Sequence, residues 1–102
     1  QGLGVYSISK TALLALTKVL ANELGTDGIR VNCIAPGIIK TNFSRALWEN
    51  ESVQQEVVRT IALKRVGTSD ECAGLVSFLS SDDASYITGE TVVVSGGAPS
   101  RL

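Results

Sequence analysis

The chain has 102 residues, of which 44% are apolar and 19% are charged, and its formal net charge is -1. This is the composition of one soluble globular domain or part of one. The balanced charge gives no indication of a nucleic-acid partner or an anionic membrane surface. No apolar run approaches the roughly 20 residues of a membrane-spanning helix, and the start lacks the pattern of a secretion signal.

Histidine and cysteine limit the possible chemistry. Histidine is absent, which excludes Ser-His triads, histidine metal sites and imidazole acid–base catalysis. Cys33 and Cys72 lie in separate apolar segments without a C-x-x-C pair, so we expect two buried free thiols and a reducing compartment. Proton chemistry must then use Tyr, Lys, Asp or Glu, and no metal site is expected.

The first predicted element is a long helix over residues 5–24. Its apolar side chains recur near the helical period, with a stripe formed by Leu13, Leu16, Leu20 and Leu24. The stripe is widened by Ala12, Leu14, Ala15 and Val19, so the helix needs cover on more than one side. Gly25 is a typical C-terminal residue, and residues 26–28 read as a turn.

A buried strand is predicted next, because residues 29–35 are rich in β-branched side chains and end at Pro36-Gly37. After Thr41 the pattern becomes irregular and then more polar from residue 51 to residue 63. We interpret this stretch as one or two short helices in a long excursion, which often carries binding surface.

The last two predicted elements are a helix and a strand. Thr68 and Glu71 have capping-box spacing and precede an apolar helix that ends near residues 80–81. Residues 91–94 form a second buried strand, and Gly96-Gly97 ends it in a turn. No helix follows these glycines, which disfavours a phosphate cradle.

Helix, strand, excursion, helix and strand is an α/β pattern, and two continuous apolar strands favour a parallel sheet covered on both faces. Two strands alone would leave a strand edge and a broad helix face exposed. We therefore expect further strands, from missing sequence or from another chain.

Tyr6 and Lys10 are four residues apart and fall on one face of the first helix. A free phenol has a pKa near ~10, and an ammonium within a few Å favours the phenolate. The pair is therefore a candidate general acid or base, although solvated surface pairs have the same spacing. Ligands of open α/β sheets bind beyond the carboxyl ends of the strands, where residues 36–41 would fall.

Taken together, these residues resemble the short-chain dehydrogenase/reductase family, over essentially the whole chain. The matching features are the Y-x-x-x-K pair Tyr6/Lys10 with the small Ser9 and Ala12, the strand Arg30-Val31-Asn32, Pro36-Gly37 with Ile39 and Thr41, and the tail from Gly89-Glu90-Thr91 to Gly96-Gly97. The resemblance implies the C-terminal half of a Rossmann-type doubly wound parallel sheet, with residues 1–102 as part of a single domain.

The resemblance also implies roles for individual residues. Tyr6 would exchange a proton with the substrate oxygen, while hydride moves between the substrate carbon and a nicotinamide cofactor. Lys10 would lower the pKa of Tyr6 and hold the nicotinamide ribose. The cofactor-binding set would be completed by the segment after the strand, namely Pro36, Gly37, Ile39 and Thr41, with the Ile39 backbone and the Thr41 hydroxyl on the carboxamide.

The substrate side would be lined by residues near the pair and in the excursion: Gly2, Leu3, Phe43, Leu47 and Trp48. Phe43 and Trp48 could equally pack the excursion against the sheet. Asn32 is interpreted as a structural hydrogen-bonding residue.

Within the family the chain is most like the peroxisomal NADP-dependent carbonyl and retinal reductases, through residues 41–45, 84–90 and 100–102. This likeness implies NADP rather than NAD, small carbonyl or alcohol substrates and a homotetramer. Ser100-Arg101-Leu102 resembles the Ser-Lys-Leu peroxisomal address, so we expect a peroxisomal protein, with the cytoplasm as the alternative.

The family's glycine-rich phosphate loop, its NAD/NADP selector and its catalytic Asn and Ser precede the tyrosine, and this chain holds no counterpart. Ser7 and Ser9 do not replace that Ser, because they lie within the predicted helix. Two functions are therefore considered. One is the C-terminal half of a carbonyl reductase, inactive by itself, and the other is a truncated, non-catalytic partner of full-length subunits.

Overall fold

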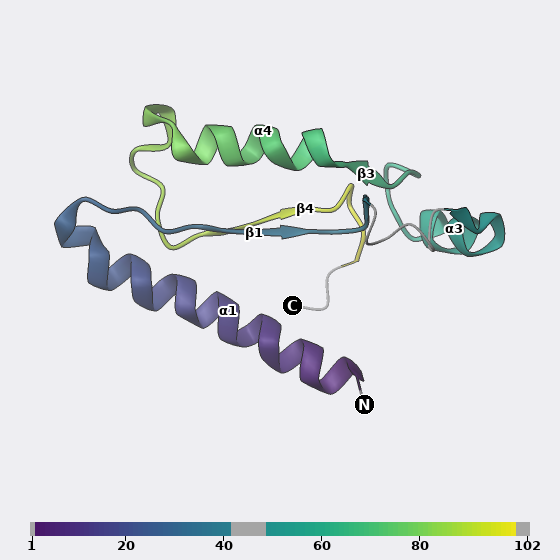
Figure 1. The fold of residues 1–102 in the computed structure, drawn as a ribbon, viewed down its shortest axis with the longest axis horizontal. Helices are drawn as coiled ribbons and strands as arrows, with labels where there is room; N and C mark the ends of the chain where they lie inside the picture. The colour runs from purple at the N-terminus through teal and green to yellow at the C-terminus, as the bar shows by residue number, and fades with distance from the viewer. Residues whose placement is uncertain (1, 42–48, 100–102) are drawn as a thin grey trace.

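The computed structural model describes residues 2–41 and 49–99, and it has three layers (Figure 1). The main elements are α1 (Gly2–Leu24), β1 (Cys33–Pro36), α4 (Ser69–Ser80) and β4 (Thr91–Val94). β1 and β4 pair in parallel, from Cys33 opposite Thr91 to Pro36 opposite Val94. α1 and α4 lie on opposite sides of this strand pair. The predicted α/β fold with parallel strands is confirmed.

Smaller elements gather at the carboxyl end of the two strands. β2 (Ile39–Lys40) pairs in parallel with β3 (Gly67–Thr68), and α3 (Glu51–Arg59) lies beyond them (Figure 1). Short 3-10 turns cover Gly25–Asp27 and Asp82–Ala84. The predicted helical stretch over residues 51–63 ends at Arg59, because the chain there turns back toward the end of β4. Leu63 N donates to Gly96 O at 2.9 Å, and Ile61 is only 3% exposed.

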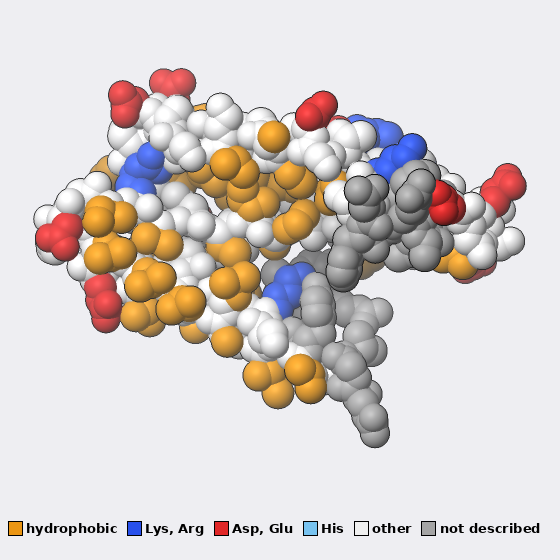
Figure 2. Space-filling view, viewed as in Figure 1, with side chains coloured by type: hydrophobic (Ala, Val, Ile, Leu, Met, Phe, Trp, Pro, Cys, Tyr) orange, Lys and Arg blue, Asp and Glu red, His pale blue; other side chains and the backbone are white. Residues whose placement is uncertain are grey.

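The sheet-facing side of α1 differs from the predicted leucine stripe. Thr17 and Ala21 are buried and Leu14 is half-buried, whereas Leu13 and Leu16 are 50% and 51% exposed. Small side chains let the helix approach the sheet closely. A Cβ added at Gly89 would lie 3.3 Å from the Ala21 Cβ. Figure 2 shows the resulting apolar surface along the outer side of α1.

The strand predicted over residues 29–35 is regular only from Cys33. Before that point side chains replace part of the backbone ladder. Asn32 Nδ2 donates to Ile87 O at 3.0 Å, and Asn32 Oδ1 accepts from Glu90 N at 3.1 Å. Val31 N donates to the Thr88 hydroxyl at 3.0 Å. The structural hydrogen-bonding role of Asn32 is thus confirmed.

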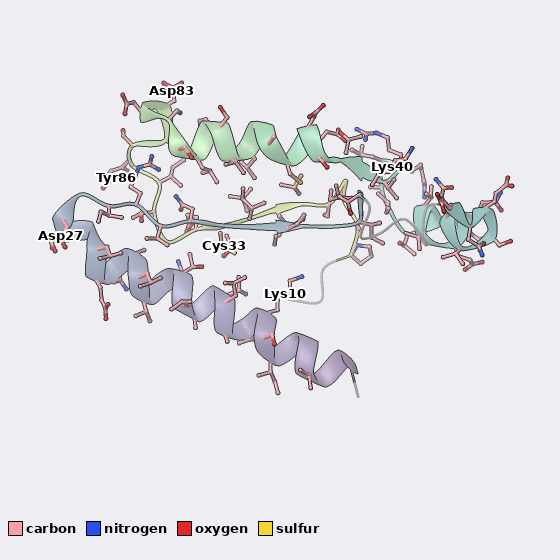
Figure 3. All side chains as sticks on the ribbon, in the orientation of Figure 1. Lys10, Asp27, Cys33, Lys40, Asp83 and Tyr86 are labelled. Atoms are coloured by element: carbon pink, nitrogen blue, oxygen red, sulfur yellow. The ribbon has the colours of Figure 1, made fainter. Side chains whose placement is uncertain are left out.

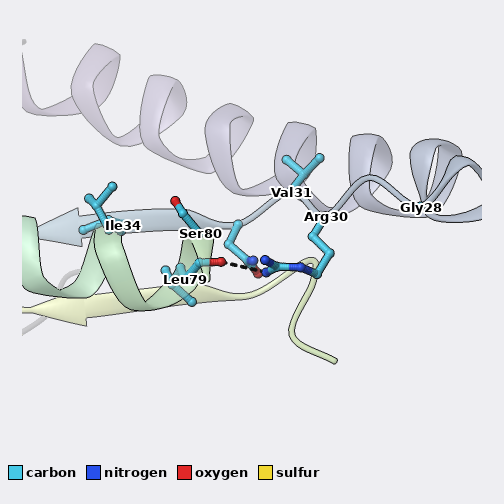
Figure 4. Close-up of a pocket in the computed structure, with 8 residues that line it drawn as sticks. Gly28, Arg30, Val31, Ile34, Leu79 and Ser80 are labelled. Atoms are coloured by element: carbon cyan, nitrogen blue, oxygen red, sulfur yellow. Dashed lines mark hydrogen bonds between the residues drawn. The ribbon is translucent and has the colours of Figure 1, made fainter. Parts of the chain in front are cut away.

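α4 is held at both ends. Glu71 Oε1 accepts from Thr68 N at 2.9 Å, so the predicted capping box is confirmed. At the other end Arg30 donates to Leu79 O at 2.7 Å (Figure 4). It also donates to Ser81 O at 3.2 Å. These carbonyls carry the negative end of the helix dipole, which a guanidinium stabilises. The pocket beside them, about 530 Å³, is therefore lined by an arginine that already has backbone acceptors.

Both cysteines are free thiols, with Cys33 buried and Cys72 half-buried. Complete burial of Cys72 was therefore a wrong expectation, since it lies near the start of α4 on a side that the chain covers only in part. In the described ranges no helix combines the length and hydropathy needed to cross a membrane. The same ranges contain no group of three His, Cys, Asp or Glu residues placed to hold a metal.

Candidate active site

Lys10 lies on the sheet-facing side of α1. It precedes Leu14, Thr17 and Ala21 at intervals of four, three and four residues, which is one row along a helix. Lys10 is half-buried and reaches toward the sheet (Figure 3), whereas Ile8 is 72% exposed. This placement disfavours a solvated surface role for Lys10. Position 6 belongs to the same row one turn earlier, while the Tyr6 side chain lies outside the described atoms.

A pocket of about 320 Å³ lies between the N-terminal half of α1 and β1. Cys33 points into this interlayer space from β1, toward α1 (Figure 3). Among the described lining residues Lys10 is the charged one, and most of the others are apolar. The lining consists of Ser9, Lys10, Leu13, Leu14, Cys33, Ile34, Ala35 and Pro36. An ammonium beside apolar walls can donate hydrogen bonds to the hydroxyl groups of a ligand, in a pocket from which the walls exclude water.

The carboxyl end of β1 opens at this pocket. Gly37 N donates to Val94 O at 2.7 Å, which extends the β1–β4 pairing by one bond. A Cβ at position 37 would lie 2.9 Å from the Ser95 Cα, so only glycine permits this approach. Pro36, without a backbone donor, is the last residue of the strand. The sequence Pro36-Gly37 thus ends the strand and releases the chain into the next loop.

That loop, residues 37–41, contains β2 (Ile39–Lys40). Ile39 pairs with Gly67 and Lys40 with Thr68, and Gly67 N donates to Ile38 O at 3.0 Å. Thr41 follows directly and is half-buried. Lys10 and the 37–41 loop therefore both belong to the carboxyl end of the β1–β4 pair, where α/β folds bind ligands.

An ion pair that the sequence reasoning missed lies behind this loop. Arg65 Nη1 and Nη2 donate to Glu71 Oε1 and Oε2 at 2.8 and 2.7 Å. The bonds from Arg65 and from the Thr68 N–H lower the pKa of Glu71 to about 2. The bonds to the Glu71 carboxylate raise the pKa of Arg65. Glu71 was recognised only as a capping residue. The available signal was an arginine six residues before it, across Gly67-Thr68.

Comparison with known proteins decides the family. A family model described as Enoyl-(Acyl carrier protein) reductase matches residues 1–99. The rabbit (Oryctolagus cuniculus) protein named Dehydrogenase/reductase SDR family member 4 is 62% identical over the whole chain. This chain belongs to the short-chain dehydrogenase/reductase family. The human (Homo sapiens) protein of the same name is 59% identical over 99% of the chain.

The chain covers only part of these family members, 39% of the rabbit protein and 36% of the human one. The solved structures agree in fold. A 4-hydroxyisoleucine dehydrogenase complexed with NADH matches 92% of this chain and 39% of its own, with a TM-score of 0.88 and 35% identity. A proposed 2-deoxy-D-gluconate 3-dehydrogenase from Agrobacterium tumefaciens with bound NADP matches 90% and 37%, with a TM-score of 0.85 and 41% identity.

The described residues fit the nicotinamide half of such a cofactor. Lys10 places an ammonium at a largely apolar pocket, and the 37–41 loop places backbone groups and the Thr41 hydroxyl at the same end of the sheet. Several predicted residues lie outside the described part. These are Phe43, Leu47 and Trp48, the surroundings of Gly2, the Leu3 side chain, and the tail Ser100-Arg101-Leu102. Their predicted roles stay predictions.

Proposed function

We propose that this chain supplies the tyrosine-lysine half of the active site of an oxidoreductase that reduces ketones and aldehydes, such as retinal, to alcohols with NADPH. One observation carries the proposal most directly. Lys10, the lysine of the family's Y-x-x-x-K pair, is half-buried beside a largely apolar pocket at the carboxyl end of β1. The Lys10 ammonium therefore lies at the place where a ligand in this pocket would meet N–H donors.

Each residue of the half-site has a distinct task. NADPH, when bound, supplies the hydride that reduces the carbonyl carbon. Tyr6 donates its phenolic proton to the carbonyl oxygen, and Lys10 favours the resulting phenolate and donates to the ribose hydroxyls. Backbone groups of Ile39 and the Thr41 hydroxyl orient the carboxamide. Leu13, Leu14 and Ile34 line the Lys10 pocket and limit the access of water.

The cofactor preference, the location and the assembly rest on the likeness to the NADP-dependent peroxisomal reductases, with NAD and the cytoplasm as alternatives. The proposed homotetramer has the same support. Deleting Ser100-Arg101-Leu102 should move a fluorescent fusion of the chain from peroxisomes to the cytoplasm. An unchanged distribution in microscopy would refute the address.

A chimera tests the catalytic role. Residues 1–102 would replace the matching segment of the rabbit relative, because the chain spans 39% of that protein. Tyr6→Phe should lower kcat/KM for a carbonyl substrate by roughly 10²- to 10⁴-fold, since the proton donor is removed. Tyr86→Phe is the matched control, because Tyr86 is fully exposed. Retained turnover in Tyr6→Phe refutes the role of Tyr6, and an inactive parent chimera refutes the oxidoreductase proposal.

The outer surface of α1 favours a second candidate, a non-catalytic assembly partner. Leu16 and Val19 are each about half exposed and Ile8 is 72% exposed, which gives this helix a large apolar outer face. The 102-residue chain should then co-sediment with the full-length rabbit relative in analytical ultracentrifugation. Separate sedimentation of the two proteins contradicts this candidate.

A further inference from the structure

We infer that Arg65 and Glu71 are positioning residues for the nicotinamide-binding loop, residues 37–41. The inference deepens the proposed function and rests on it. Neither side chain is proposed to touch the cofactor. Their ion pair fixes β3, and β3 fixes β2, which is the outer part of the loop.

The ion pair has the geometry of a rigid clamp. Both guanidinium nitrogens donate to separate carboxylate oxygens at 2.8 and 2.7 Å, which sets the planes of the two groups together. Glu71 Oε1 also accepts from Thr68 N at 2.9 Å and from the Thr68 hydroxyl at 3.2 Å. One carboxylate thus joins Arg65, the end of β3 and the first turn of α4.

The clamp reaches the loop through β3. Thr68 is the N-cap of α4 and also the partner of Lys40 in the β2–β3 ladder. A Cβ added at Gly67 would lie 2.8 Å from Ile39 Cδ1 and 3.8 Å from Glu71 Oε1. The Ile39 side chain therefore lies directly over Gly67, close to the carboxylate. Arg65, Glu71 and Ile39 also line one small pocket of about 120 Å³.

The ladder needs such support because it is short. Each of its strands has two residues, and isolated strand pairs of this length are not stable in water. The clamp is half-exposed, with 53% of the Arg65 side chain and 40% of the Glu71 side chain accessible. Ion pairs at this exposure contribute little to global stability. We therefore expect its main effect on the geometry of the loop.

The kinetic experiment uses the rabbit chimera with Glu71→Gln and Arg65→Lys. The KM for NADPH should rise roughly tenfold, because a displaced loop misaligns the carboxamide. The KM for the carbonyl substrate should not change. The inhibition constant of 2′-phospho-ADP-ribose should also stay constant, since this probe has no nicotinamide. A global defect would weaken the binding of both NADPH and 2′-phospho-ADP-ribose. An equal change in the two constants overturns the inference.

Glu56→Gln is the matched control, because it removes the same charge from an exposed pair with Arg59 on α3, 3.7 Å long. The KM of Glu56→Gln for NADPH should equal that of the parent chimera. The inference is overturned if the KM for NADPH rises as much in Glu56→Gln as in Glu71→Gln. It is also overturned if this KM is unchanged in Glu71→Gln.

Amide hydrogen exchange supplies a readout that does not need activity. Exchange at Ile39 and Lys40 should become faster in Glu71→Gln and not in Glu56→Gln. Unchanged exchange overturns the inference even if the parent chimera is inactive. If the parent chimera is inactive and exchange is nevertheless faster in Glu71→Gln, the proposed function is refuted. The effect of the Arg65–Glu71 ion pair on the loop is then still established.

Discussion

The two long helices are held in different ways. Polar groups tie α4 at both ends, through Glu71 at its start and Arg30 at its end. α1 has no acidic residue in its first turn and no basic residue in its last turn. It lies against the sheet through small side chains such as Ala21, and the exposed ion pair Lys18–Glu90, 3.6 Å long, also joins it to the start of β4. α4 is therefore anchored by directional bonds and α1 by packing.

This difference matters because α1 carries the Tyr-Lys pair. Packing contacts are not directional, and they stabilise a helix in proportion to the apolar area that they bury. The inner row of α1 presents Lys10 to the pocket, and its outer face is apolar and exposed. We expect a covering partner or further chain to fix α1. By the same reasoning, the isolated chain should have a low free energy of unfolding or should aggregate.

The largest expected effect comes from breaking the anchor of α4. Arg30→Ala removes the donors to Leu79 O, Ser81 O and Ile87 O. Loss of these charge-assisted bonds should lower the free energy of unfolding by about 2–4 kcal/mol. Urea unfolding of the chimera, followed by circular dichroism, measures the change. Arg59→Ala, on an exposed ion pair of α3, should stay close to the parent.

The same contrast explains which parts of the fold the sequence could predict. The start of α4 was predictable because a capping box is local, three residues from Thr68 to Glu71. The end of β1 was predictable from Pro36-Gly37. The beginning of β1 was not, since Asn32 bonds to Ile87, 55 residues away. The inner face of α1 was not either, because apolar residues surround the helix and its period does not select one side.

The candidate site was predictable to a similar degree. Tyr6 and Lys10 follow from a local spacing together with the family resemblance, and the structure places Lys10 on the inner face. The Arg65–Glu71 pair depends on the path of the chain between two short strands. No pattern of hydrophobicity reports that path. Side-chain positions in residues 42–48 lie outside the described ranges, so the predicted substrate contacts stay predictions.

Acid should weaken the N-terminal anchor of α4, which is a smaller effect than loss of Arg30. The pKa of Glu71 is lowered to about 2 from its usual value of 4.5. A lowered folded-state pKa stabilises the fold above the unfolded value, and this contribution is lost as the pH falls through about 2. The unfolding midpoints of the parent and Glu71→Gln should thus differ most at neutral pH and converge below about pH 4.5. A difference that grows on acidification contradicts this assignment, and Glu56→Gln is the control.

The smallest expected effect on folding stability comes from the outer face of α1. Leu16→Gln and Val19→Gln change half-exposed side chains and should alter the free energy of unfolding by less than about 1 kcal/mol. Leu14→Gln is the matched control on the inner face, where Leu14 lines the pockets on both sides of the α1–sheet contact. It should cost more than either outer substitution, because it places an amide against apolar walls.

The outer substitutions should affect assembly more than the inner one, which is the reverse of their order in folding stability. If a second subunit covers the outer face of α1, Leu16→Gln and Val19→Gln should shift the chimera toward smaller species in sedimentation velocity. Leu14→Gln should lower the unfolding midpoint without that shift at concentrations where the protein is folded. Equal effects of all three substitutions on both measurements would mean that α1 has no distinct inner and outer faces. The contrast between a packed α1 and an anchored α4 would then be wrong.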